Sequence, residues 1–139
     1  MSNAHIAEQL FDAFNNSDWD TARKYAGTDL SYQEMATGRV TQGVEGWIEN
    51  SKGWQAAFSN AKGTLVNRFE VDDKVVEEVV WSGTHDGDLV TPDGQTIPPT
   101  NKSMETPAIM INTFKDGQLV AVNHYFDMMS MMAQLGLLG

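Results

Sequence analysis

The chain has 139 residues, of which 41% are hydrophobic and 20% charged, a composition typical of one globular domain and unlike that of disordered or collagen-like chains. Nine Lys and Arg stand against nineteen Asp and Glu, for a formal net charge of -10. The chain therefore lacks the clustered cations on which binding to nucleic acid or to an anionic membrane depends. Cysteine is absent, which excludes disulfides, thiolate catalysis and cysteine-bound metal sites.

The sequence also lacks signals for export or membrane insertion. No apolar run approaches the ~20 residues that a membrane-spanning helix needs. Residues 1–5 have none of the basic, apolar and cleavage regions of a signal peptide. We therefore expect a single domain over residues 1–139, located in the cytoplasm.

The first residues of the chain predict two helices. Apolar residues recur at helical spacing over residues 4–14. Ser17 or Asp18 can cap a second short helix. Gly27 is expected to end that helix, since glycine is the residue preferred just after a helix C-terminus.

The rest of the chain predicts one more long helix and then strands. We expect a short strand over residues 30–35 and a helix over residues 43–58, where apolar residues lie near helical spacing. From Gly63 onward the apolar period changes to two, which is the period of strands. Four strands bounded by turn residues are expected: residues 64–71, 74–85, 102–114 and 118–126. Methionines at helical spacing predict a closing helix over residues 127–135.

These elements predict an α+β domain. The short connections between the strands favour antiparallel neighbours, and helices that precede such a sheet pack on one of its faces. We expect N-terminal helices packed on a curved antiparallel sheet of about four to six strands, with a short C-terminal helix. Such a cone has a cavity at one end, a suitable place for a ligand.

Five short motifs, in this order and spacing, carry a resemblance to a known family. They are Gly-Thr-His-Asp-Gly at 83–87, Ile-Pro-Pro-Thr at 97–100, Phe-Lys-Asp-Gly-Gln-Leu at 114–119, Tyr-Phe-Asp at 125–127 and Gln-Leu-Gly-Leu at 134–137. Together they resemble the SnoaL-like polyketide cyclases, or ester cyclases, of the nuclear-transport-factor-2-like (NTF2-like) superfamily. The resemblance implies a cone-shaped fold, commonly dimeric, with a cofactor-free active site inside the cone.

The resemblance also implies a reaction and a catalytic residue. Characterised members of the family close a ring by intramolecular aldol condensation of a polyketide ester, with one aspartate as acid and base. In the family's pattern this aspartate is Asp127. The chain departs from the pattern at Asn123, where many relatives have Trp, and at Asn101, where they have Gly. The family's catalytic histidines correspond by spacing to Thr113 and Tyr125, so that catalytic set is not reproduced.

Alternation along the last strand predicts which residues face the cavity. It places Asn123, Tyr125 and Asp127 on one face and His124 on the other. We interpret the first face as the inner one, where a carboxylate of Asp127 deprived of water could take and return a proton. Tyr125 and Asn123 would then donate hydrogen bonds to the enolate oxygen. The alternative is that Asp127 caps the final helix.

Further site residues are expected from other strands and helices. His85 could polarise a carbonyl or relay a proton to Asp127, or it could be a histidine hydrogen-bonded within its turn. Trp81, Trp54 and Tyr32 could stack on a planar ligand, although aromatic residues at such spacings commonly belong to the core.

The opposite face of the last strand predicts a subunit interface. His124 would lie there, on an outer surface or an interface, beside an apolar stripe of Val120, Val122 and Phe126. An exposed stripe of this kind favours association. We therefore expect a homodimer through the outer face of the sheet.

Potential metal ligands are present without a recognised ligand spacing. They are His85, Asp86, Asp88, His124 and Asp127. No zinc-protease or nucleotide-binding motif occurs. We therefore expect neither a metal nor a cofactor.

Two classes of function remain open from the sequence. The first is a cofactor-independent enzyme that acts next to a carbonyl of a hydrophobic small molecule, either as a polyketide cyclase or as a ketosteroid-isomerase-like isomerase. The second is a non-catalytic domain that binds a small apolar ligand. Fold alone does not choose between them.

Overall fold

The computed structural model describes residues 1–138, which form four helices and eight strands. In chain order they are α1 (Asn3–Asn16), α2 (Trp19–Tyr25), β1 (Ala26–Glu34), β2 (Val40–Gln42), α3 (Gly43–Ala57), β3 (Lys62–Val71), β4 (Lys74–Thr84), β5 (Leu89–Val90), β6 (Thr96–Ile97), β7 (Ser103–Lys115), β8 (Gln118–Phe126) and α4 (Met128–Gln134). The predicted α+β class is confirmed. The hairpin of β5 and β6 and the short strand β2 are additions to the predicted elements.

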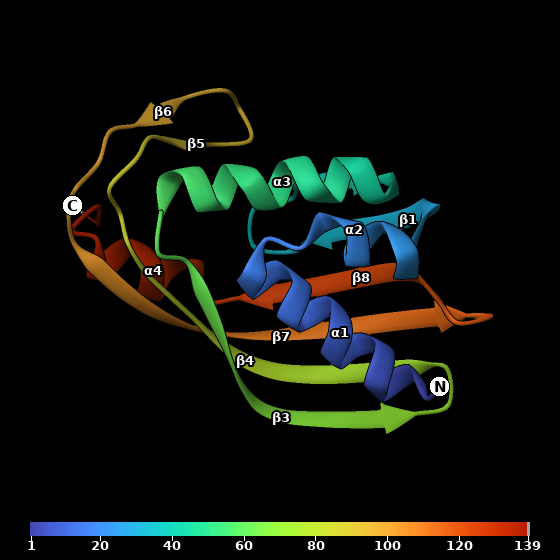
Figure 1. The fold of residues 1–139 in the computed structure, drawn as a ribbon. Helices are drawn as coiled ribbons and strands as arrows, with labels where there is room; N and C mark the ends of the chain where they lie inside the picture. Colours follow the sequence, from blue (N-terminus) through green and yellow to red (C-terminus); the bar gives the residue numbers. More distant parts are fainter. Residues whose placement is uncertain (139) are drawn as a thin grey trace.

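Six strands form one curved sheet in the order β2-β1-β8-β7-β4-β3. Helices α1, α2 and α3 lie on one face of this sheet, and α4 lies at the end where the chain finishes (Figure 1). The sheet is mixed, because β1 pairs with β8 in parallel. The predicted all-antiparallel pairing is wrong for this pair alone, since β1 and β8 are joined by a long crossover rather than a tight turn.

Local signals set the helix boundaries. The Ser2 side chain accepts a hydrogen bond from the His5 backbone N–H at 3.1 Å, which caps α1. Asp18 caps α2 in the same way through the Thr21 N–H, at 3.2 Å. The prediction that Gly27 ends α2 is wrong, because Ala26 is already extended and Gly27 belongs to β1.

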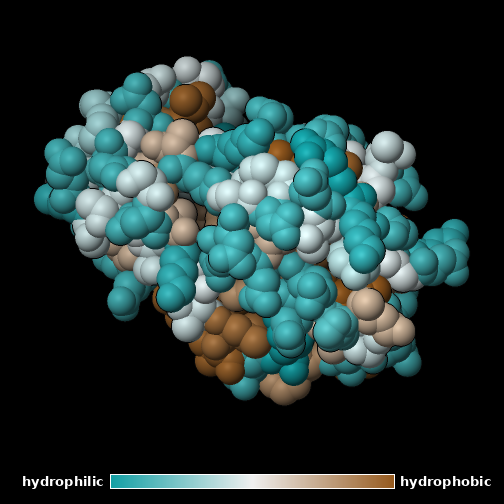
Figure 2. All heavy atoms as spheres, in the orientation of Figure 1, coloured by the Kyte–Doolittle hydropathy of each residue, from teal (hydrophilic) through white to brown (hydrophobic). Residues whose placement is uncertain are grey.

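The core lies between the helices and the inner face of the sheet. Ile6 and Leu10 of α1 and Ile48 of α3 are buried against sheet residues that include Val75 and Val122. Each such side chain contributes roughly 1.5–3 kcal/mol through the apolar surface it removes from water. The helical side of the molecule presents mainly hydrophilic side chains to solvent (Figure 2). None of the helices within residues 1–138 is long and apolar enough to cross a membrane.

A β-bulge in β8 decides which residues face the core. In the pairing of β7 with β8, Phe114 lies opposite Leu119 and Thr113 lies opposite Ala121, so Val120 is an extra residue without a partner. One extra residue reverses the alternation of every side chain that follows it.

The predicted faces of β8 are therefore wrong after the bulge. Val122 and His124 are buried, with 3% and 7% of their surface exposed, whereas Tyr125 is 43% exposed on the outer face. The expected outer stripe is wrong for Val122 and Phe126, since both line the interior.

Candidate ligand-binding cavity

An apolar cavity of about 110 Å³ lies between the helices and the inner face of the sheet. Its wall is mainly aromatic and aliphatic, with contributions from α1, α3, α4 and five strands of the sheet. The wall includes the aromatic and polar side chains of Tyr32, Trp54, Glu77, Trp81, Asn112 and His124. The volume is smaller than the roughly 150 Å³ apolar cavity that holds one benzene. The cavity in this form therefore suits a small guest, and a larger one requires side chains of the wall to move.

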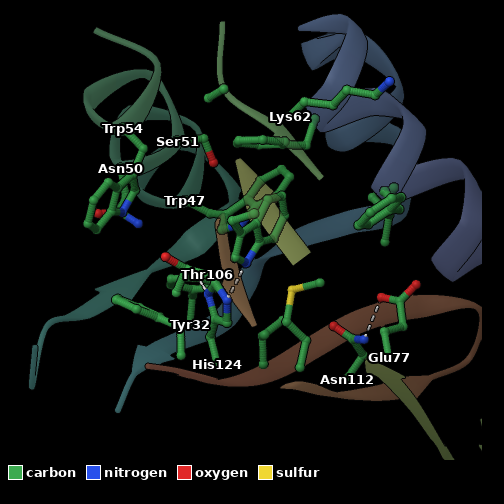
Figure 3. A pocket seen from close by; sticks show the side chains of 18 of the residues that line it. Tyr32, Trp47, Asn50, Ser51, Trp54, Lys62, Glu77, Thr106, Asn112 and His124 are labelled. Atoms are coloured by element: carbon green, nitrogen blue, oxygen red, sulfur yellow. Dashed lines mark hydrogen bonds between the residues drawn. The ribbon is translucent and has the colours of Figure 1, made fainter. Parts of the chain in front are cut away.

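Three polar side chains meet at one part of the wall. Figure 3 shows the dashed lines that converge on the ring of His124. Its Nδ1 lies 2.6 Å from the Tyr32 hydroxyl oxygen, and its Nε2 accepts a hydrogen bond from the Trp81 indole N–H at 2.9 Å. Burial lowers the pKa of His124 to about 4, so the ring is neutral at neutral pH. Because Trp81 already occupies the Nε2 lone pair, His124 is poorly placed to act as a base.

A second polar group lies at a different part of the wall. The carboxylate of Glu77, on β4, is 3% exposed. Its Oε2 accepts hydrogen bonds from Arg68 Nε at 2.9 Å and Nη2 at 2.6 Å, and its Oε1 accepts one from the Asn112 side chain at 3.0 Å. Burial raises the pKa of Glu77, and the contacts with Arg68 and Asn112 offset part of this shift. Among residues 1–138, Glu77 is the only carboxylate that lines this cavity.

A third buried group orients one of the wall tryptophans. Glu34 is fully buried, and its Oε2 accepts hydrogen bonds at 2.8 Å from the Trp54 indole N–H and from the Asn50 amide. Its Oε1 accepts from Thr37 at 2.8 Å and lies 3.7 Å from Arg39. These contacts satisfy the carboxylate and fix the Trp54 ring in the cavity wall.

The five predicted substrate-binding residues fall into two groups. Trp81, Trp54 and Tyr32 line the cavity, and their contact with a substrate stays a prediction. Asn123 and Tyr125 lie on the outer side of the sheet, so their expected inward orientation is wrong.

Asp127 lies outside the cavity. Its side chain is exposed and accepts a hydrogen bond from the Ser130 backbone N–H at 2.9 Å, which caps α4. It borders an open groove of about 300 Å³ on the outer face of the sheet, together with Tyr125 and Ile109. The expected inward orientation is wrong because of the bulge at Val120. The capping role that the sequence left open is present, and the catalytic role stays a prediction.

His85 lies apart from both the cavity wall and Asp127. The side chain is fully buried, its Nδ1 contacts the Thr100 hydroxyl at 3.1 Å, and its ring packs on Phe58 at 5.3 Å between centroids. Its Nε2 has no hydrogen-bond partner among residues 1–138. The relay expected between His85 and Asp127 has no support in this arrangement. Residues 1–138 contain no group of three or more His, Asp or Glu side chains placed to hold a metal ion.

Sequence reasoning missed His124 and Glu77 as residues of the cavity. The signal for Glu77 was present, because it occupies an inward position of β4 between Val75 and Val79. A charged residue at such a position is rarely buried without a partner or a function. No comparable signal existed for His124, since the bulge at Val120 is invisible in the alternation of the sequence.

The cone of helices and curved sheet around an interior cavity places this protein in the NTF2-like class. The family model for SnoaL-like polyketide cyclases matches residues 4–135, and the chain belongs to that family. A search of curated protein sequences finds no match.

Solved structures share this fold. The chain is similar to a candidate SnoaL-like polyketide cyclase from Jannaschia sp. CCS1, with a TM-score of 0.86 and 18% identity over 99% of this chain and 93% of that one. It is similar to IdmH, a candidate polyketide cyclase from Streptomyces antibioticus, with a TM-score of 0.81 and 25% identity over 97% and 99% of the two chains. A protein with a ketosteroid isomerase-like fold from Catenulispora acidiphila gives a TM-score of 0.79 and 19% identity over 96% and 93%.

Proposed function

We propose that this protein binds a hydrophobic, carbonyl-bearing small molecule in the interior cavity and moves a proton next to that carbonyl, with no cofactor. The observation that carries the proposal is a largely apolar cavity with one carboxylate in its wall, Glu77, whose pKa is raised by burial. A carboxylate with a raised pKa is a better proton acceptor near neutral pH. Membership of a family of polyketide cyclases supports this class of reaction.

The proposed step moves one proton and one electron pair. The Glu77 carboxylate takes a proton from the carbon next to the carbonyl, and the electron pair of that C–H bond forms a C=C bond while the carbonyl oxygen becomes an enolate oxygen. If the enolate carbon then attacks a second carbonyl of the same molecule, a new C–C bond closes a ring and Glu77 returns its proton to the resulting alkoxide. If the proton instead returns to another carbon, the product is an isomer.

Asp127 is the competing acid and base, on the pattern of the family. Its position as the exposed cap of α4 requires a substrate that reaches outside the cavity or a displacement of that helix. A role of Glu77 and a role of Asp127 as the base therefore predict opposite effects of substituting each residue on the rate of proton exchange.

Exchange of deuterium into a simple ketone tests the proposal. The protein is incubated with cyclohexanone or 2-tetralone in D2O, and loss of the proton signal next to the carbonyl is followed by NMR. We expect exchange to be faster than in matched buffer, and we expect Glu77→Gln to reduce this acceleration by at least about 100-fold. Asp127→Asn is expected to keep the wild-type rate, and thermal unfolding of both variants verifies that each is folded. Loss of exchange in Asp127→Asn alone would assign the role to Asp127.

A second candidate function is binding without chemistry. It is favoured by the small volume of the cavity and by the fact that two ionisable groups in its wall are already engaged, His124 by Trp81 and Glu77 by Arg68 and Asn112. This function predicts stoichiometric binding of the same ketones with no acceleration of exchange in any variant.

We also propose that a second copy of the chain covers the outer face of the sheet. This face exposes apolar side chains from three strands, including Val66 of β3, Ile109 of β7 and Tyr125 of β8. Exposed apolar patches of this kind commonly mark interfaces, and a two-fold dimer pairs the same face of both copies.

A further inference from the structure

We propose that the Tyr32 hydroxyl is the hydrogen-bond donor that receives the carbonyl oxygen of a guest in the cavity, and that Trp81 and His124 hold it in that role. This inference rests on the proposed function in one respect, that the guest carries a carbonyl. It assigns a donor that neither the motifs nor the alternation of the sequence indicated.

The contact with Trp81 determines which nitrogen of His124 carries the proton. An indole N–H can only donate a hydrogen bond, so His124 Nε2, which lies 2.9 Å from Trp81 Nε1, must accept and must carry no proton. A neutral imidazole has one N–H, and that proton is therefore on Nδ1. The rings of Phe11 and Phe14 pack on Trp81, at 5.9 and 5.2 Å between centroids, and hold the indole in place.

The position of this proton determines the direction of the hydrogen bond between His124 and Tyr32. His124 Nδ1 lies 2.6 Å from the Tyr32 hydroxyl oxygen. Because Nδ1 carries the proton, the imidazole donates and the phenol oxygen accepts. The hydrogen of the phenol itself is not used in this contact.

The hydrogen of the Tyr32 hydroxyl is therefore free to bind an acceptor in the cavity. Within residues 1–138 the Tyr32 hydroxyl has no hydrogen-bond partner other than His124. Tyr32 is 5% exposed and lines the cavity, so the group that can accept its hydrogen is a guest in that cavity. A buried donor without an acceptor is unfavourable, so a guest that accepts this hydrogen is stabilised at this point of the cavity.

The surroundings keep Tyr32 in the donating form. Burial, and then the negative charge of Glu34, raise its pKa well above its usual range, so the phenol stays protonated at any physiological pH. A hydroxyl that accepts a hydrogen bond from His124 also becomes a stronger donor, because chains of hydrogen bonds polarise one another.

Histidine NMR tests the orientation of the chain of hydrogen bonds. We expect the ¹⁵N shifts of His124 in the wild-type protein to report a proton on Nδ1 and none on Nε2. Trp81→Phe removes the N–H that fixes this state, and we expect the Nε2–H form to become populated. Trp54→Phe is the matched control, because its indole lines the same cavity but donates to Glu34. An Nε2–H histidine in the wild-type protein overturns the inference.

Two probes of nearly equal shape test the donor itself. Cyclohexanone carries a C=O group where methylenecyclohexane carries C=CH2, so the ratio of their dissociation constants isolates the hydrogen bond to oxygen. We expect Tyr32→Phe to weaken cyclohexanone relative to methylenecyclohexane by roughly fivefold, and to shift the C=O stretching band of bound cyclohexanone to higher frequency. Trp81→Phe should give part of the same change although Tyr32 is still present, and Trp54→Phe should not.

The outcomes separate this inference from the proposed function. An unchanged ratio and an unchanged C=O band in Tyr32→Phe overturn the donor role, whatever the rate of deuterium exchange. A ratio that depends on Tyr32 in a protein that does not accelerate exchange supports the donor and rejects the proton transfer. Both probes measure binding alone, so neither result depends on turnover.

Discussion

The two faces of the central sheet treat polar side chains in different ways. On the inner face Glu77 and His124 are buried, and each has protein partners at hydrogen-bond distance. On the outer face Glu78 is half-buried and Asp127 is exposed, and exposed apolar residues lie around them. Burial of a polar group is unfavourable unless the protein supplies its hydrogen-bond partners. The polar side chains of the inner face are therefore held in position by these partners, whereas those of the outer face can bind water instead.

Neighbouring glutamates on β4 give the largest expected contrast. Glu77→Ala leaves Arg68, whose side chain is 13% exposed, without its closest carboxylate, and we expect the free energy of unfolding to fall by roughly 3–5 kcal/mol. Glu78→Ala removes a half-buried carboxylate that accepts a hydrogen bond from Asn67 at 2.7 Å, and we expect a change below about 1 kcal/mol. Urea unfolding of both variants measures the contrast, and equal losses would contradict it.

The pH dependence of stability gives the second contrast. His124 is buried with a pKa lowered to about 4, whereas an unfolded histidine titrates near 6.5. The unfolded chain therefore binds this proton more readily, so the stabilisation by neutral His124 is present above about pH 6.5 and is lost as the pH falls toward 4. A full shift of this size corresponds to about 3 kcal/mol.

A matched variant isolates that histidine from the other acid groups. Urea unfolding at several pH values is compared for wild type and His124→Gln, and we expect a flatter curve between pH 6.5 and 4 in the variant. Glu77 acts in the opposite sense, because its raised pKa makes its contribution greater at low pH and lost as the pH rises. Parallel curves for the two proteins would contradict the assignment of the slope to His124.

Asp127 gives a smaller effect that sharpens the distinction between capping and catalysis. Asp127→Ala removes the side chain that caps α4 and is expected to cost about 1 kcal/mol. Asp127→Asn keeps an oxygen that can accept the Ser130 N–H, so we expect stability close to wild type. Thermal unfolding of the pair measures this, and an equal loss in both variants would mean that the negative charge matters more than the cap.

Ile109 on the outer face gives the smallest expected effect on folding and a clear one on assembly. The side chain is 36% exposed, so Ile109→Lys should change the free energy of unfolding of the monomer by no more than about 0.5 kcal/mol. If a second copy covers this face, the variant should be monomeric in analytical ultracentrifugation under conditions where the wild type is dimeric. A wild-type protein that sediments as a monomer at all concentrations would reject the interface.

The spacing of apolar residues predicted most of the fold, because within most segments this spacing matches the helix or strand that the segment forms. The helix of residues 4–14 corresponds to α1, and the four predicted strands correspond to β3, β4, β7 and β8 with small shifts of their ends. The parallel pairing of β1 with β8 was out of reach, because it depends on contacts between segments far apart in the sequence. The hairpin of β5 and β6 has only two residues in each strand, too few to show a period.

The site was less predictable than the fold. Tyr32, Trp54 and Trp81 were proposed from residue type to stack on a ligand; they line the cavity, and their contact with a ligand stays a prediction. The residues of β8 were placed on the wrong faces, because one unpaired residue shifts the pattern without any change in local composition. The hydrogen-bond partners that determine which nitrogen of His124 carries the proton lie on β1 and β4. They cannot be predicted from the sequence of β8 alone.

The unpaired residue at Val120 also bears on how relatives of this protein are compared. In an aligned column, a relative with the insertion and one without it present the same amino acid to opposite sides of the sheet. Two homologues with identical letters after this point would then have differently lined interiors. Loss or gain of a single codon here would move the side chains of the rest of β8 to the opposite sides of the sheet, and would change the lining of the cavity without any substitution.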